Sequence, residues 1–141
     1  MNKVELAYTA GLFDGEGSVS IHQTLYSVAL HIQIANANFE ALSWIKDSFG
    51  GSISIYKDRR NGHSSYRWRT ASKKASFFLE QVLPFLRIKV PQANLALKFQ
   101  SLKKHGSEYQ KGELDNQKEY KVSLERMNRE QYIKYDRKEV K

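Results

Sequence analysis

The N-terminal segment from residue 3 to residue 13 is apolar on nearly every side of the helix that its spacing predicts. At about 100° per residue, Val4, Tyr8 and Leu12 lie on one side of this helix, and Leu6 and Phe13 lie on the opposite side. The small residues Ala7, Ala10 and Gly11 fill the arc between these two sides. Only Glu5 and Thr9 are polar, and Asn2 is a suitable N-cap. A helix of this kind is buried on more than one side. The 141 residues suffice for one domain with a core, so we expect that core on one side and a second subunit against the small-residue arc.

Directly after this helix, the sequence Asp14-Gly15-Glu16-Gly17 places an acid between two glycines. We expect the helix to end at Phe13 and a strand to begin at Ser18, with turn-prone residues between them. Asp14 is expected to be structural, ending the helix and accepting hydrogen bonds from nearby amides. An acid held where a buried helix meets a strand is a candidate metal ligand, and the simpler interpretation is a solvated side chain in a turn.

Two pairs of segments alternate between apolar and polar residues with a period of two, which predicts half-buried strands in antiparallel hairpins. The pairs are 18–25 with 28–36, and 52–57 with 65–71. The positions expected to face the core are Val19, Ile21, Leu25, Val28, Leu30, Ile32, Ile34, Ile53, Ile55, Tyr66, Trp68 and Thr70. The opposite face is polar and carries His22, His31, Gln33, Arg67 and Arg69.

A helix is predicted after each hairpin, and two more helices follow. The predicted helices are one capped by Asn38 and ending near Phe49, one capped by Ser72 and reaching about Leu86, one from Pro91 to about Gly106, and one capped by Asp115 from about Asn116. We expect a loop at 106–114 and a charged tail at 134–141. The result is an α+β chain with αββαββα order and additional C-terminal helices. We predict a single domain over 1–141, with its core at about 3–103 and a helical extension at about 107–141.

The charge balance favours a polyanionic partner. The net charge is +8 and the pI is about 9.6. An aromatic content of 12% favours nucleic acid over an acidic membrane surface. There is no cysteine, which excludes disulfides, thiolate zinc sites and cysteine nucleophiles. No apolar signal core or bilayer-spanning run is present, so nothing indicates secretion and we expect no membrane partner. These observations leave the compartment open; our expectation is an intracellular protein, organellar or encoded by a bacterium or phage.

Three segments resemble the LAGLIDADG homing endonucleases. Residues 8–18 resemble the signature of that family, with Thr9 in place of its first Leu, Phe13 in place of Ile and Glu16 in place of the second Asp. Residues 84–89, followed by Gln92-Ala93, resemble the segment after the second hairpin, and 49–53 resemble the turn into the third strand. The resemblance covers about residues 3–103 in the expected order, and it implies the αββαββα LAGLIDADG fold.

The resemblance also implies a homodimer, because this chain shows one copy of the motif. The signature helices of two subunits would pack together through Ala7, Ala10, Gly11 and Asp14, and bring two acids beside two scissile phosphates. In each subunit Glu16, with the Gly15 carbonyl, would hold Mg²⁺, which binds with one or two carboxylates, carbonyls, water and substrate phosphates. Mn²⁺ or Ca²⁺ can substitute in binding.

Further catalytic residues are implied near the metals. Lys89 matches the family's lysine there, and Asn36 stands at a position that is usually polar and often Gln. The basic residue that the family carries early in its second helix is not evident, since Asn38 and Glu40 stand in that neighbourhood.

The polar face of the antiparallel sheet is the predicted DNA-binding surface, because a DNA major groove admits β-ribbons. The side chains expected to contact double-stranded DNA are Ser20, His22, Thr24, His31, Gln33, Ser54, Tyr56, Arg60, Arg67 and Arg69. The two histidines are better DNA contacts than metal ligands, because no second pair of ligands accompanies them; their simplest interpretation is exposed strand residues.

The implied function is a sequence-specific, metal-dependent endonuclease that cuts both DNA strands at a pseudo-palindromic site, as in intron homing. The alternative is a non-cleaving nucleic-acid binder of the same fold, such as an intron RNA maturase or a transcription regulator. A third hypothesis, a basic dimeric structural module, predicts no salt-sensitive DNA binding.

Overall fold

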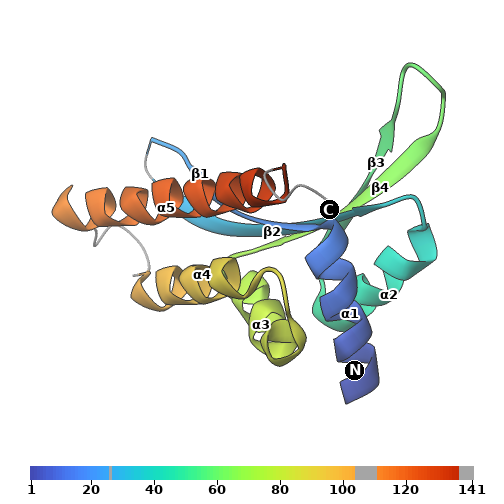
Figure 1. The fold of residues 1–141 in the computed structure, drawn as a ribbon, viewed down its shortest axis with the longest axis horizontal. Coiled ribbons are helices and arrows are strands. Elements are labelled where there is room, and N and C mark those ends of the chain that lie inside the picture. The colour runs from blue at the N-terminus through green and yellow to red at the C-terminus, as the bar shows by residue number, and fades with distance from the viewer. Residues whose placement is uncertain (26, 104–110, 137–141) are drawn as a thin grey trace.

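A four-stranded antiparallel sheet in the order β1-β2-β4-β3 is the centre of the fold in the computed structural model (Figure 1). The structure describes residues 1–25, 27–103 and 111–136, with the side chains of the last helix described from 115 to 130. The strands are β1 (Gly17–Gln23), β2 (Val28–Asn36), β3 (Ser52–Lys57) and β4 (Ser64–Ala71). The two predicted hairpins are present, and they join into one sheet because β2 pairs with β4 at its centre.

Four helices lie on one side of the sheet, below it in Figure 1. They are α1 (Lys3–Glu16), α2 (Phe39–Phe49), α3 (Ser72–Val82) and α4 (Val90–Leu102), with the 3₁₀ turn η1 (Leu83–Phe85) after α3. The fifth helix, α5 (Lys111–Asp136), runs along β1 and also packs against α4. The predicted αββαββα order with additional C-terminal helices is confirmed. Among the described helices, none is long and apolar enough to cross a membrane.

The core lies between the apolar face of the sheet and this helical layer, as the alternation predicted. Trp68 and Phe13 reach it from β4 and α1 and meet Phe78 of α3, whose ring centroid is 5.1 Å from that of Trp68 and 5.2 Å from that of Phe13. The indole Nε1 of Trp68 donates to the Gly50 carbonyl over 2.8 Å, so its polar atom is satisfied. This aromatic cluster fixes the last turns of α1 against the sheet.

Two of the positions expected to face the core are exposed instead, Leu25 and Ile55. Leu25 is 85% exposed because β1 ends at Gln23, so the predicted strand at 18–25 is too long. Ile55 lies within β3. It is 65% exposed although its alternation matches that of Ile53. The hairpin of β3 and β4 extends past the helical layer in Figure 1, so no helix covers this end of the strand. Alternation predicts which face a residue occupies, but not whether another element packs on that face.

Several predicted boundaries differ from the structure. Ser72 is the first residue of α3 with φ of 52°, and Ala71 is the N-cap. That helix ends at Val82, not near Leu86, because Pro84 cannot donate a helical hydrogen bond and the chain tightens into η1. The last helix begins at Lys111, so Asp115 lies inside it and caps nothing. The rest of the predicted loop, at 106–110 with Gly106, and the end of the tail, at 137–141, lie outside the described residues.

Helix α5 covers the β1 edge of the sheet. Leu124 is buried, and the side-chain amide of Asn128 donates to the Val19 carbonyl of β1 over 3.2 Å. An unpaired edge strand is a template for unwanted pairing with another chain. The extension therefore covers a strand edge that the αββαββα unit leaves open.

Candidate functional site

The C-terminus of α1 places Glu16 in solvent where the chain enters the sheet. The helix runs through Glu16, so the expectation that it ends at Phe13 is wrong, and Gly17 is both its C-cap and the first residue of β1. A Cβ on Gly17 would lie 2.2 Å from Cδ2 and 2.5 Å from the carbonyl oxygen of Phe13. Only glycine fits, and this tight junction holds Glu16 at the rim of the sheet.

The Asp14 carboxylate is directed toward the interior of its own chain. The side chain is 8% exposed. It accepts hydrogen bonds from three successive backbone amides, those of Arg87 (2.7 Å), Ile88 (3.2 Å) and Lys89 (2.9 Å). The structural function predicted for Asp14 is thus present in altered form: its amides come from the distant linker between η1 and α4, and it lies within the helix instead of ending it.

Lys89 meets the end of α1 through its side chain. Its Nζ donates to the backbone carbonyl of Asp14. The last carbonyls of a helix lack intrahelical donors and form the negative end of the helix dipole, so an ammonium group is stabilised there. Burial lowers the pKa of Lys89 below its ordinary value, while the negative charges of Asp14 and Glu16 act in the opposite direction. One cation and one free acid therefore share the junction.

The outer face of α1 is an exposed stripe of apolar and small residues, which consists of Val4, Ala7, Tyr8, Gly11 and Gly15. Val4 is 79% exposed and Tyr8 59%. A Cβ on Gly11 or Gly15 would meet no neighbour within 4 Å, leaving out the helix's own nearby backbone, so packing in this chain does not require glycine at either position. Ala10, predicted with Ala7 and Gly11 at a dimer interface, is instead fully buried in the chain's own core. Asp14, predicted there too, is nearly buried against its own linker.

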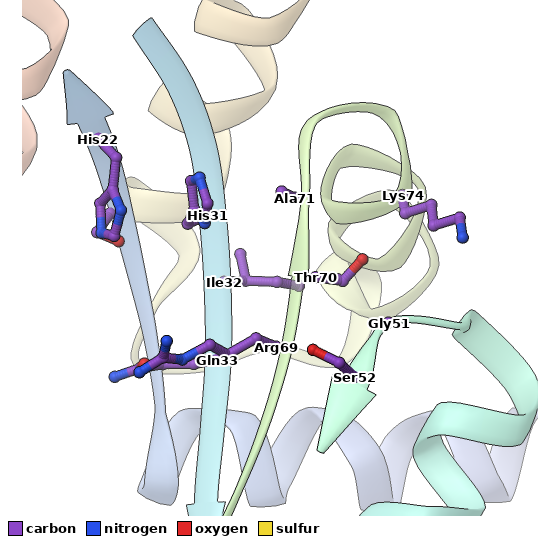
Figure 2. Close-up of a pocket in the computed structure, with 11 residues that line it drawn as sticks. His22, His31, Ile32, Gln33, Gly51, Ser52, Arg69, Thr70, Ala71 and Lys74 are labelled. Atoms are coloured by element: carbon purple, nitrogen blue, oxygen red, sulfur yellow. The ribbon is translucent and has the colours of Figure 1, made fainter. Parts of the chain in front are cut away.

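The polar face of the sheet is hollowed between β1 and α3 (Figure 2). The hollow has a volume of about 630 Å³ and is lined by Ser20, His22, His31, Ile32, Gln33, Gly51, Ser52, Arg69, Thr70, Ala71 and Lys74. The rings of His22 and His31 stack at 4.2 Å between centroids. Burial lowers the pKa of His31, and His22, Arg69 and Lys103 lower it further by charge.

A second group of polar side chains continues along β3 and β4. The register places Ser54 opposite Arg67, and the Arg67 guanidinium carbon lies 5.4 Å from the centre of the Tyr56 ring. The other two predicted contacts lie off the strands. Thr24 follows β1, with its hydroxyl 2.8 Å from that of Ser27, and Arg60 is exposed in the turn between β3 and β4.

The family model for LAGLIDADG endonucleases matches residues 9–104. The chain belongs to the LAGLIDADG endonuclease family. It is 31% identical over 104 residues to the DNA endonuclease I-CreI of Chlamydomonas reinhardtii, which covers 69% of this chain and 63% of I-CreI, so the chain spans less than two thirds of that relative.

Two solved structures show the likeness of fold. The structure of the homing endonuclease I-CvuI in complex with the I-CreI target matches with a TM-score of 0.74 at 18% identity, covering 89% of this chain and 82% of that one. The archaeal intron-encoded homing endonuclease I-Vdi141I, complexed with DNA, matches with a TM-score of 0.72 at 18% identity, covering 88% and 84%. The predicted LAGLIDADG fold is therefore confirmed.

Within this LAGLIDADG chain, the donors at the junction suit a hard divalent cation. Glu16 offers an exposed carboxylate. The Gly15 carbonyl belongs to the last turn of α1, and it lacks an intrahelical donor because Val19, four residues later, is already in β1. The Asp14 oxygens are occupied by amides. The described residues contain no group of three or more side chains that could hold a metal ion. Mg²⁺ needs only one or two carboxylates when phosphates and water complete its shell, so the donor set fits that ion.

Asn36 stands at the end of β2, close to the same junction. The register pairs Gly17 with Ile34, so two further residues bring β2 to the end of α1. The Asn36 side-chain oxygen accepts from the Asn38 amide over 2.8 Å, and Asn38 in turn caps α2. The Asn36 oxygen thus has a structural partner, and its catalytic contribution stays a prediction.

Sequence reasoning missed two exposed polar side chains of the hollow, Ser52 and Lys74. Ser52 could have been found, because it shares the strand face of Ser54. Lys74 lies on α3, and only the packing of that helix brings its ammonium toward Gly50. No local pattern carries this information.

Proposed function

We propose that this LAGLIDADG protein is a metal-dependent DNA endonuclease that acts as a homodimer on duplex DNA. The observation that carries the proposal is that the two acids of the motif, Asp14 and Glu16, lie in different environments. Asp14 is nearly buried and occupied by amides, whereas Glu16 is exposed beside the Lys89 ammonium. A solvent-facing acid on a rigid junction is available to a metal and a phosphate, and the second acid supports the scaffold.

The homodimer follows from the incompleteness of one chain. Among the described residues, a single subunit offers one free carboxylate at this junction, and two-strand cleavage needs a reactive site at each of two phosphates. The exposed stripe of α1 has small residues at Ala7, Gly11 and Gly15, which allow a second backbone to approach closely. A twofold axis along this stripe would bring two Glu16 residues near each other, and a symmetric protein would act on a pseudo-palindromic site.

The bound cation, Mg²⁺ in our proposal, would activate water and stabilise the leaving oxygen of the phosphodiester. Glu16 and the Gly15 carbonyl would hold this cation, and Mn²⁺ or Ca²⁺ would be able to substitute in binding. Lys89 holds positive charge beside the scissile phosphate, where an ammonium partly removed from water interacts more strongly than one in bulk solvent. Lys89→Met should therefore lower the cleavage rate by about 10²–10³-fold, with little effect on DNA affinity.

The polar face of the sheet reads the DNA on either side of the cut. Arginine and glutamine side chains such as Arg69 and Gln33 can form paired hydrogen bonds with base edges. The stacked His22 and His31 add donors and acceptors next to them. Phosphate contacts set the register of the protein on the duplex, while these base contacts supply the sequence preference.

A randomised duplex library tests the proposal. Duplexes retained in Ca²⁺ are sequenced, and their cleavage is then followed in Mg²⁺ for the wild type, Glu16→Gln and the matched control Glu5→Gln, which alters an acid at the other end of α1. We expect all three to retain the same pseudo-palindromic duplexes and only the wild type and Glu5→Gln to cut them. Retention by all three with cutting by none would overturn the enzyme proposal.

The second candidate is a non-cleaving binder, such as an intron RNA maturase or a transcription regulator. It is favoured by the hydrogen bond that occupies the Asn36 oxygen and by Glu40, an acid in the first turn of α2 where the resemblance implies a basic residue. Competition of the selected duplex with folded intron RNA separates these possibilities. Preference for the RNA, without cutting of DNA, would favour the maturase.

A further inference from the structure

The contact between α1 and the linker before α4 joins the two halves of the proposed site. Three successive amides of residues 87–89 converge on one carboxylate: Oδ2 of Asp14 accepts from Arg87 and Ile88, and Oδ1 accepts from Lys89. Successive backbone N–H groups of this kind form a concave nest for an anion. Here the anion is a side chain of the same chain, nearly buried at 8% exposure.

The same residue receives the lysine side chain. The Lys89 ammonium donates to the backbone carbonyl of Asp14, while the Lys89 amide donates to the Asp14 carboxylate. Both ends of Lys89 are thus tied to one residue of α1, which lies two positions before Glu16. A lysine on a free linker would instead sample many rotamers, and ordering it would cost entropy at the moment of reaction.

We infer that Asp14 is a positioning residue that fixes Lys89 next to Glu16, in addition to its part in the scaffold. This inference rests on the proposed endonuclease function for its consequence, although the positioning itself is present without DNA or metal. Asp14 touches no reacting atom in this account. It acts through the backbone and the side chain of Lys89.

The variant Asp14→Asn tests this contact because it replaces one carboxylate oxygen with an NH₂ group. Asparagine keeps one acceptor oxygen, which can serve Arg87 and Ile88, but its NH₂ group would face the N–H of Lys89, so two donors would oppose each other. The Lys89 end of the nest should open while the other end persists. The matched control is Glu5→Gln, which alters the capping box at Asn2, where Glu5 accepts from the Asn2 amide over 2.7 Å.

Two measurements on metal-free protein test the inference without any cleavage. Mass-spectrometric labelling by an amine-acylating reagent should modify Lys89 at least about tenfold faster in Asp14→Asn than in the wild type or Glu5→Gln, with the exposed Lys73 as internal reference. Amide hydrogen exchange should lose protection at Lys89 in the same variant. Unchanged labelling and exchange at Lys89 would overturn the inference. If Asp14→Asn does not fold, Asp14→Glu, which keeps the charge and displaces the carboxylate by one methylene, carries the same test.

A third measurement connects positioning to the reaction. In a wild type that cleaves DNA, Asp14→Asn should lower the single-turnover rate by about 10–100-fold, the range found when a supporting partner of a ligand is removed, and leave the DNA dissociation constant within about twofold. An unchanged rate despite faster Lys89 labelling would contradict the inference. A wild type that cuts nothing would overturn the proposed function instead, and the labelling result would still decide whether Asp14 positions Lys89.

Discussion

Gly17 and Phe13 are packed so closely that the backbone of one lies against the ring of the other. A Cβ on Gly17 would stand 2.2 Å from the Phe13 Cδ2 atom, although the φ of −88° and ψ of 160° at Gly17 are open to any residue. Glycine is required there by space and not by backbone conformation. Glu16 owes its position to this contact, because the chain can pass from helix to strand in a single residue.

The glycines on either side of Glu16 should therefore respond to alanine in opposite ways. Gly17→Ala should lower the free energy of unfolding by about 1–3 kcal/mol, because a methyl group is forced into a filled core. Gly15→Ala should raise it by up to about 1 kcal/mol, because Gly15 is in a helix with open space around it. Urea unfolding at low protein concentration, followed by circular dichroism, measures both. Equal destabilisation by the two variants would contradict the packing at this junction.

Gly11→Leu should convert a dimer into a monomer without unfolding it. A leucine would hold the partner helix away from the exposed stripe, whereas in its own chain even the Cβ position is free of neighbours. Sizing with light scattering gives the mass, and the control is Glu80→Leu, which adds the same side chain to an exposed position of α3. An unchanged dimer in Gly11→Leu would refute the interface proposed along α1.

The lowered pKa of Lys89 predicts how the free energy of unfolding depends on pH in the alkaline range. Because burial lowers its pKa in the folded state below the ordinary value of 10.5, the unfolded chain binds more protons between the two pKa values. The contribution of Lys89 to the free energy of unfolding should therefore rise as the pH increases across that window. Lys89→Met should lose this rise relative to the wild type in urea unfolding between neutral pH and pH about 10. The exposed Lys98→Met is the control, and a parallel loss in both variants would contradict the burial of the Lys89 ammonium.

Arg69 predicts part of the salt dependence of DNA binding. It is exposed on the polar face and lines the hollow beside Gln33. The Arg69 guanidinium can contact a phosphate as well as a base edge, and loss of the phosphate contact in Arg69→Ala should reduce the slope of log affinity against log salt by about 1. Lys3→Ala removes the same charge from the first residue of α1 and should leave the slope unchanged, because the N-terminal end of this helix points away from the sheet (Figure 1). Equal slopes for Arg69→Ala and wild type would exclude a phosphate contact by this side chain.

The parts of this fold that follow a local rule could be predicted from sequence. The period of two fixed β2 and β3 to the residue, and Asn38 marked the start of α2 through its capping hydrogen bond. The last turn of α1 could not be predicted in this way. Two glycines and an acid normally end a helix, but here the distant amides of 87–89 satisfy Asp14 and the Lys89 side chain satisfies its carbonyl.

The candidate site likewise contains residues that could be predicted from the sequence and residues that could not. Sequence reasoning marked Glu16 from its motif and Lys89 from the family resemblance, but neither spacing nor composition indicates that residues so far apart share one helix end. Ala10 was misplaced because the helix carries small residues on both its buried and its exposed side. Lys74 was missed because its place depends on how α3 packs on the sheet.

Cleavage depends above all on Glu16, as the proposed carboxylate ligand of the metal ion. The most direct measurement is single-turnover cleavage of a selected duplex in Mg²⁺ by the wild type and Glu16→Gln, with each DNA strand labelled separately and the dissociation constant measured in Ca²⁺. We predict that the wild type cuts both strands and that Glu16→Gln binds with similar affinity but cuts neither. Cleavage by Glu16→Gln at the wild-type rate would contradict this prediction.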